Sequence, residues 1–140
     1  MAIPTHSAFD PTNTYVHLED GGEAMPVTVT ATFWQELMTG DYHSEETTRV
    51  ANGDGWLVTK FHMSNDSPTW EMHPAGDELL YLLSGAMQII LEDQGGNRVV
   101  ELRMGEACLV PRGLWHRPMV RTSGDLLAIT YGKGTQNRPA

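Results

Sequence analysis

The sequence predicts an all-β domain in which short antiparallel strands close into a barrel or sandwich. Turn residues (Gly, Pro, Asn or Asp) recur at short intervals from Ala51 onward, and these residues tolerate or impose turn dihedrals. The segments between them have the length and content of strands, and many short strands usually form a sandwich or barrel. With 140 residues and 40% hydrophobic content, the chain can bury one core but is too short for two ordinary domains.

Residues 51–131 form the predicted barrel. Its candidate strands are residues 56–63, 69–73, 78–83, 86–92, 98–103, 107–110, 115–121 and 126–131. Each break between two of these strands contains a Gly, Pro, Asn or Asp, which ends one strand and starts the next.

Residues 1–50 are predicted to be an N-terminal arm that packs on the barrel or on a partner subunit. Residues 15–18 and 27–30 resemble short strands. Thr32 as N-cap, with Gln35 three residues later, resembles a capping box that opens one short helix, which Gly40 would end. Residues 41–48 are polar without an apolar period, which predicts a solvated loop.

The tail, residues 132–140, is polar and rich in glycine. Most such tails are frayed, and the alternative is that this one folds back over the mouth of the barrel.

The formal net charge of −9 excludes non-specific attraction to nucleic acid or to an anionic membrane surface. No apolar run approaches the roughly 20 residues that span a bilayer, and residues 1–10 lack the features of a signal peptide. We therefore expect a cytoplasmic protein with no nucleic-acid or membrane partner. The single cysteine, Cys108, lies among apolar residues, which predicts a buried, inert thiol.

Candidate chemistry begins with Glu71 and His73, which lie two residues apart on a predicted strand and so share a face. The turn at residues 74–77 can bring Glu78 beside His73, and a second tight turn at residues 111–113 precedes His116. Two imidazoles and a carboxylate suit a first-row divalent ion. Taken singly, each histidine is more often structural than ligating, so the combination carries this hypothesis.

Three other residues are weaker candidates. His62 lies on the preceding strand, where it either lines the same cavity or is an ordinary surface histidine. Arg117 and Arg121 share a face of a later strand, where they either hold an anionic substrate or pair with surface acids, and the second reading is favoured.

Both motifs resemble those of the cupin superfamily. The first family motif is His-x-His, three or four residues, Glu, six residues, Gly, and Glu71, His73, Glu78 and Gly85 match it except at the first histidine. The second is Gly, five residues, Pro-x-Gly, two residues, His, three residues, Asn. The residues Gly105, Pro111, Gly113 and His116 match this second motif, and Val120 replaces the Asn. The resemblance implies a double-stranded β-helix, or jelly-roll, barrel.

By this resemblance, His73, Glu78 and His116 occupy three of the family's four metal-ligand positions, and Glu71 occupies the fourth. Two carboxylates and two neutral imidazoles would neutralise a divalent ion such as Mn, Fe, Ni or Zn, and the oxygen ligands favour Mn or Fe over Cu. Alternatively, Glu71 turns toward a cation such as Lys60 or Arg103 and serves as an acid or base. A third alternative is that no metal binds.

Two classes of function follow. One is a small metalloenzyme that acts on a small polar metabolite, and the other is a metal-free binding or regulatory module. The family includes dioxygenases, isomerases, epimerases, lyases and decarboxylases, so the fold does not select a reaction. An exposed strand edge covered by the arm of a second copy would also make the protein a homodimer.

Overall fold

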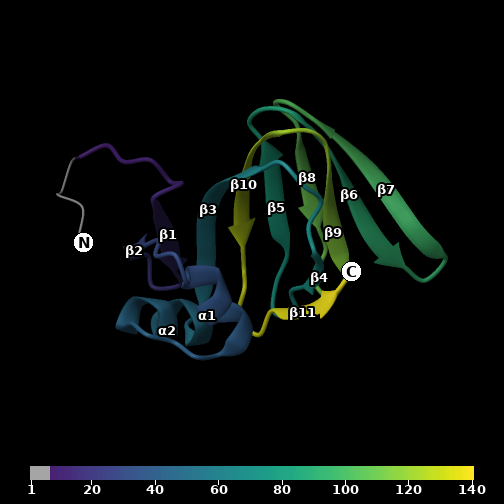
Figure 1. The fold of residues 1–140 in the computed structure, drawn as a ribbon. Helices are drawn as coiled ribbons and strands as arrows, with labels where there is room; N and C mark the ends of the chain where they lie inside the picture. The colour runs from purple at the N-terminus through teal and green to yellow at the C-terminus, as the bar shows by residue number, and fades with distance from the viewer. Residues whose placement is uncertain (1–6) are drawn as a thin grey trace.

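Two antiparallel sheets face each other in the structure, a computed structural model that describes residues 7–140 (Figure 1). The first sheet contains β1 (Thr14–Glu19), β2 (Ala24–Thr28), β3 (Gly55–Met63), β5 (Glu78–Leu82), β8 (Ala107–Val110) and β10 (Gly124–Thr130), in the order β2-β1-β3-β10-β5-β8. The second contains β4 (Thr69–Met72), β6 (Ala86–Asp93), β7 (Gly96–Arg103), β9 (His116–Thr122) and β11 (Gln136–Pro139), in the order β11-β4-β9-β6-β7. The all-β prediction is confirmed. Residues 1–6 of the predicted arm lie outside the described residues.

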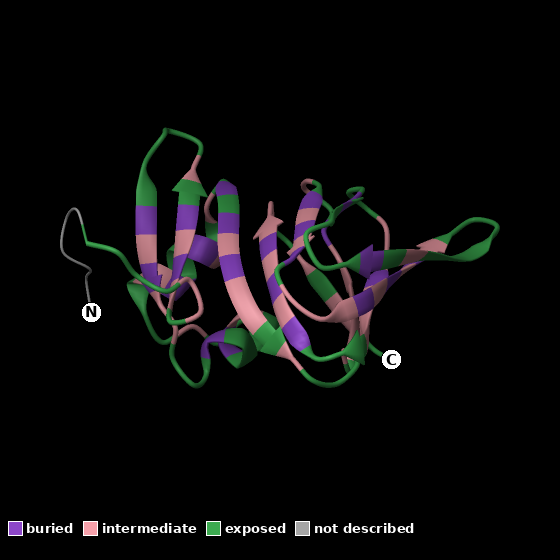
Figure 2. Cartoon of the chain, turned by 90° about the horizontal axis from the view of Figure 1, so that it is seen from above, coloured by how far each residue is buried: buried purple, intermediate pink, exposed green. Residues whose placement is uncertain are grey.

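The main core lies between the two sheets, because buried and partly buried residues alternate along the strands (Figure 2). Its buried members are Leu80, Leu82, Met87, Ile89, Leu91, Leu102, Cys108, Val110, Leu126 and Ala128. Each fully buried aliphatic side chain of this kind contributes about 1.5–3 kcal/mol to folding. The interior of the barrel is therefore filled with apolar side chains.

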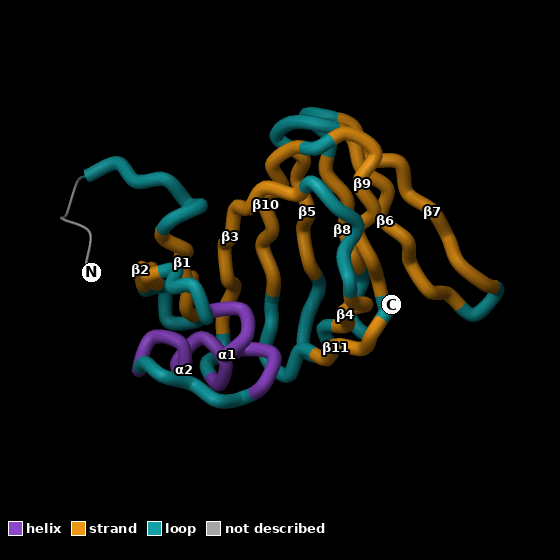
Figure 3. Tube along the Cα trace, in the orientation of Figure 1, coloured by secondary structure: helices purple, strands orange, loops and turns teal. Residues whose placement is uncertain are grey.

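The N-terminal part extends the first sheet, because β1 pairs with β3 of the same chain. Helices α1 (Phe33–Thr39) and α2 (Glu45–Asn52) lie beside β1, β2 and β3, at the lower left of Figures 1 and 3. They close a second core made of Tyr15, Met25, Val27, Phe33, Val50 and Leu57. The ring of Trp34 lies 6.3 Å from that of Phe61 and so joins the two cores. Within residues 7–140, neither helix is long and apolar enough to cross a membrane.

The prediction of a solvated loop at residues 41–48 was wrong, because α2 begins inside it. Ser44 is its N-cap, with the hydroxyl oxygen accepting the Thr47 N–H at 3.1 Å. The buried residues of the helix are Thr47 and Val50, and because residues 41–48 stop before Val50, that range shows no apolar period. The predicted first helix is confirmed, and it ends at Gly40 in the left-handed conformation.

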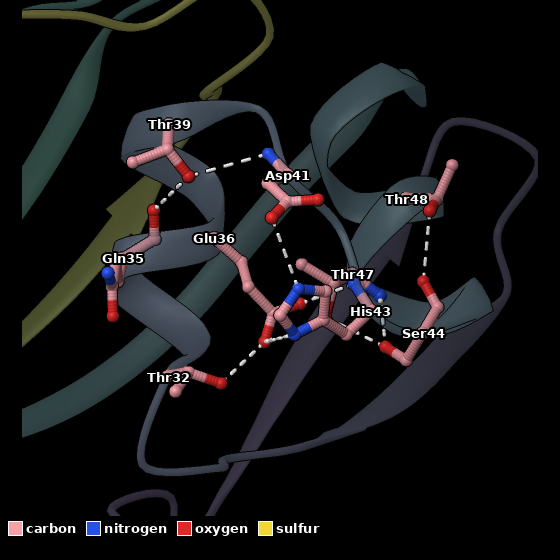
Figure 4. A network of polar contacts seen from close by, with 9 residues as sticks. All are labelled: Thr32, Gln35, Glu36, Thr39, Asp41, His43, Ser44, Thr47 and Thr48. Atoms are coloured by element: carbon pink, nitrogen blue, oxygen red, sulfur yellow. Dashed lines mark hydrogen bonds and ion pairs between the residues drawn. The ribbon is translucent and has the colours of Figure 1, made fainter.

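The predicted capping box is replaced by a network around Glu36. Thr32 does not cap the backbone, because its hydroxyl donates to the Glu36 carboxylate at 2.7 Å (Figure 4). The same carboxylate accepts the His43 N–H at 2.7 Å, and these two hydrogen bonds hold the pKa of Glu36 below its usual value. The His43 ring in turn lies 3.3 Å from Asp41. Glu36 thus connects α1 to the segment that opens α2.

The C-terminal tail folds back onto the barrel. β11 pairs with β4, and the register places Asn137 opposite Glu71. The Arg138 guanidinium lies over the rings of Trp115 (4.5 Å) and Trp70 (5.3 Å) and also pairs with Glu92. Of the two alternatives for the tail, the structure therefore shows the ordered one.

We predict that Ser44→Ala lowers the free energy of unfolding by about 1 kcal/mol, since the first turn of α2 loses its cap. Urea denaturation followed by tryptophan fluorescence measures this. Ser64→Ala, at an exposed serine outside the helices, is the control and should change stability by less than about 0.5 kcal/mol. Equal effects in the two variants would contradict the capping role.

Candidate metal centre

Two turns are hydrogen-bonded to each other where the two sheets meet. The first follows β4 and the second precedes β9. The Gly113 N–H donates to the His73 carbonyl at 2.9 Å, and the Arg112 N–H donates to the Asp77 carboxylate at 2.8 Å. Gly113 has φ +83°, and a Cβ on Gly76 would lie 2.5 Å from the Cβ of Tyr131, so both positions favour glycine. These bonds fix the ends of the strands that carry the candidate ligands.

The four predicted ligand residues come together at these strand ends. Glu71 lies on β4, His73 directly follows it, Glu78 begins β5, and His116 begins β9. One candidate ligand atom from each lies within 4.8 Å of the others. The register of β4 and β9 contributes directly, because it places Glu71 opposite His116. The four residues singled out by their spacing in the sequence thus form a potential metal site between the sheets.

Glu78 is at the centre of this cluster. Its two carboxylate oxygens lie 3.0 Å from His116 Nε2 and 3.3 Å from His73 Nε2. His73, Glu78 and His116 are 3%, 5% and 2% exposed, whereas the Glu71 side chain is 40% exposed. Solvent therefore reaches the cluster from the side of Glu71.

Burial, hydrogen bonds and neighbouring charges shift the pKa values of side chains in the cluster. Burial alone would raise the pKa of Glu78, but the hydrogen bond from His116 and the proximity of His73 hold it well below the usual range. Burial opposes protonation of His116, but the hydrogen bond to Glu78 and its charge raise the pKa of the imidazole. Burial and the charge of Glu78 raise the pKa of Glu71. The site thus holds Glu78 ionised and disfavours a second uncompensated negative charge.

His73 carries an unpartnered atom that fits a cation. Its Nε2 is buried and lies 3.3 Å from oxygens of Glu71 and Glu78, but the geometry makes neither approach a hydrogen bond. A buried polar atom without a partner is costly, and two imidazoles with two carboxylates are a ligand set for a first-row divalent ion. The residues present therefore fit a metal ion.

Sequence reasoning missed two threonines that contact the cluster. The Thr130 hydroxyl donates to Glu78 at 2.5 Å, and Thr135 Oγ1 lies 2.7 Å from His73 Nδ1. Thr130 pairs with Glu78 across β10 and β5, so only knowledge of this pairing could have identified it. The turn-forming glycines around Thr135 can be recognised in the sequence, but the sequence does not predict that this turn lies beside His73.

The weaker candidates lie elsewhere. His62 is exposed and pairs with Asp125 at 2.8 Å. Lys60, proposed as an alternative partner of Glu71, pairs with Asp10 at 2.9 Å. The Arg117 side chain donates to the Ser67 carbonyl at 2.7 Å, and Arg121 lies 3.4 Å from Glu101, as favoured for a surface pair.

A two-sheet β-barrel with a potential metal site between its sheets is the class of protein that this fold and this cluster define. Residues 57–130, more than half of the chain, match the family described as Cupin domain. The chain therefore belongs to the cupin family, which confirms the resemblance of its two motifs.

The chain is also similar to solved structures. The chain is similar to a cupin-2 domain protein from Shewanella frigidimarina (22% identity, 54% of this chain and 70% of that chain covered, TM-score 0.47). It is also similar to a protein from Neisseria meningitidis (25%, 58% and 78%, TM-score 0.47) and to an oxalate decarboxylase variant from Bacillus subtilis (15%, 62% and 24%, TM-score 0.50). Of these three, the oxalate decarboxylase variant reaches a TM-score of 0.50, and at 15% identity that similarity concerns the fold alone. No curated protein matches the sequence with significant similarity.

We predict that Cys108 is inert in the folded protein. It is buried, and burial together with the charge of Glu78 raises the pKa of its thiol, which lowers the population of the reactive thiolate. Labelling with Ellman's reagent at neutral pH should be many-fold slower in the folded protein than in urea. Rapid labelling of the folded protein would contradict this prediction.

Proposed function

We propose that this cupin binds a divalent metal ion through His73, Glu78, His116 and Glu71 and that the ion acts on or holds a small polar metabolite. The observation that carries the proposal is the buried, unpartnered Nε2 of His73, which lies within the convergent set of ligand atoms. When this nitrogen carries no proton, its lone pair is directed at the carboxyl groups of Glu71 and Glu78, and a cation between them would relieve the resulting repulsion.

The donor set narrows the choice of ion. Two carboxylates and two neutral imidazoles balance a divalent charge, and we expect Mn, Fe, Ni or Zn, with Mn or Fe favoured over Cu by the oxygen ligands. A bound ion of this kind supplies Lewis-acid polarisation of a carbonyl or hydroxyl, or activation of dioxygen.

Glu71 is the residue that distinguishes this site from the usual family pattern. It is the most exposed of the four and therefore the one that a metabolite entering from solvent meets first. Its raised pKa makes it better suited than Glu78 to take up and release a proton. Glu71 thus serves either as the fourth ligand or as an acid or base beside three ligands, and the reaction itself stays unassigned.

We predict about one equivalent of Mn, Fe, Ni or Zn per chain in untagged protein purified without chelator, measured by plasma mass spectrometry. His116→Ala should lose the metal, since it removes a buried ligand. His62→Ala, at an exposed histidine outside the cluster, should keep it.

The same measurement decides between the two classes of function. Protein that contains no metal and takes up none on reconstitution would contradict the proposal and favour a metal-free binding or regulatory cupin. Loss of metal in His62→Ala as well as in His116→Ala would show that the metal is bound elsewhere.

We also propose that the protein is a homodimer. The sequence suggested that the arm of a second copy covers a strand edge, but in the structure the arm pairs within its own chain. A different feature supports association: an apolar row crosses the outer face of the first sheet. The row consists of Val16, Val58, Ile129, Leu79 and Leu109, which are paired in register across β1, β3, β10, β5 and β8. A second copy stacked on this face would bury it.

We predict a dimeric mass by light scattering at micromolar concentration and a monomeric mass for Leu109→Glu, because Leu109 is 69% exposed in this row. Met104→Glu is the control, since Met104 is similarly exposed (67%) but lies outside the row. A monomeric mass for the unmodified protein would overturn the dimer. The cytoplasmic location stays a prediction.

A further inference from the structure

We infer that Thr135, in the C-terminal tail, is a positioning residue that fixes the tautomer of His73, so that Nε2 presents its lone pair to the metal site. The inference rests on the proposed metal-binding function. It concerns a segment that neither cupin motif includes, because Thr135 lies 62 residues beyond His73 in the chain.

The hydrogen bonds of Thr135 determine which atom carries the proton. A threonine hydroxyl has one hydrogen to donate. The Thr135 hydroxyl donates it to the Gly132 carbonyl at 2.7 Å, which can only accept. The same oxygen lies 2.7 Å from His73 Nδ1, so it must accept there, and His73 Nδ1 must be the donor. In a neutral imidazole with the proton on Nδ1, Nε2 has none.

The orientation of the hydroxyl is set by the local backbone. Thr135 closes a turn in which its N–H also donates to the Gly132 carbonyl at 3.1 Å, and Gly134 takes the left-handed conformation with φ +76°. The closed turn therefore fixes the direction in which the Thr135 hydroxyl points.

Contacts of the tail hold this turn against the barrel. Within the turn, Lys133 pairs with Asp54 at 3.0 Å, and after the turn β11 pairs with β4. Arg138 anchors the end of β11 over Trp115 and Trp70. Because β4 also carries Glu71 and is followed directly by His73, the tail pairs with the strand that positions two of the four candidate ligands.

Removing the Thr135 hydroxyl would favour the other tautomer of His73, in which Nε2 carries the proton. With no acceptor at Nδ1, the proton is more stable on Nε2, where oxygens of Glu71 and Glu78 lie 3.3 Å away. That proton would occupy the position of the metal and would have to leave before the ion binds. Partners behind a ligating histidine typically change metal affinity about 10–100-fold.

The test combines nitrogen-15 NMR of the metal-free protein, at a pH where imidazoles are neutral, with Zn²⁺ titration against a competing chelator. We expect His73 to carry its proton on Nδ1 in the unmodified protein and on Nε2 in Thr135→Val, with Zn²⁺ bound about 10–100-fold more weakly by the variant. Thr135→Ser keeps the hydroxyl and should restore both readouts. Thr122→Val, at an exposed threonine, should alter neither.

Each other result has a definite meaning. His73 with its proton on Nε2 in the unmodified protein would overturn the inference without any variant, even if Thr135→Val failed to fold. An unchanged tautomer and Zn²⁺ affinity in a folded Thr135→Val would overturn it as well. A tautomer change in a protein that binds no Zn²⁺ would uphold the role of Thr135 and contradict the proposed metal-binding function.

Discussion

The buried carboxylate of Glu78 is the group on which the arrangement of this barrel depends. Taking an ionised carboxylate out of water costs several kcal/mol unless other groups compensate for it. Here the compensation comes from His116 at the start of β9, His73 after β4, and the Thr130 hydroxyl on β10. These partners belong to both sheets, so the charge can be buried only where the sheets meet in one particular register.

The hydrogen bonds between the turns and the docking of the tail maintain that register. The hydrogen bond from Gly113 to His73 joins the turn that precedes β9 to the turn that follows β4. The contact of Thr135 with His73 joins the C-terminal tail to the same place. Because the candidate ligands extend from different sheets, an ion bound among them would also connect the sheets, and its binding energy would add to the stability of the fold. Site and fold are therefore stabilised by the same contacts.

The residues that could be predicted from the sequence differ from those that could not in how far along the chain their partners lie. Glu71, His73 and Glu78 could be predicted to lie together because strand alternation and one tight turn are local features, and His116 could be added because it matches the second cupin motif. Thr130 and Thr135 could not, because they reach the cluster across 52 and 62 residues of chain. Helix α2 was missed for another reason: its buried face consists of a threonine and a single valine, so packing against the first sheet, more than an apolar period, stabilises it.

Because Glu71 stands at the first histidine of the family motif, the cluster contains two carboxylates and two imidazoles instead of one carboxylate and three imidazoles. In the absence of a cation, its carboxylate is close to that of Glu78, and the repulsion favours protonation of Glu71. A divalent ion reverses the sign of this interaction, because both carboxylates then face positive charge. Binding of an ion would therefore be coupled to loss of the proton from Glu71, and its energy would include the attraction of both carboxylates. Glu71 is also the most exposed of the four, so an ion in the cluster would face solvent on the side of Glu71 and buried side chains on the side of His73, Glu78 and His116.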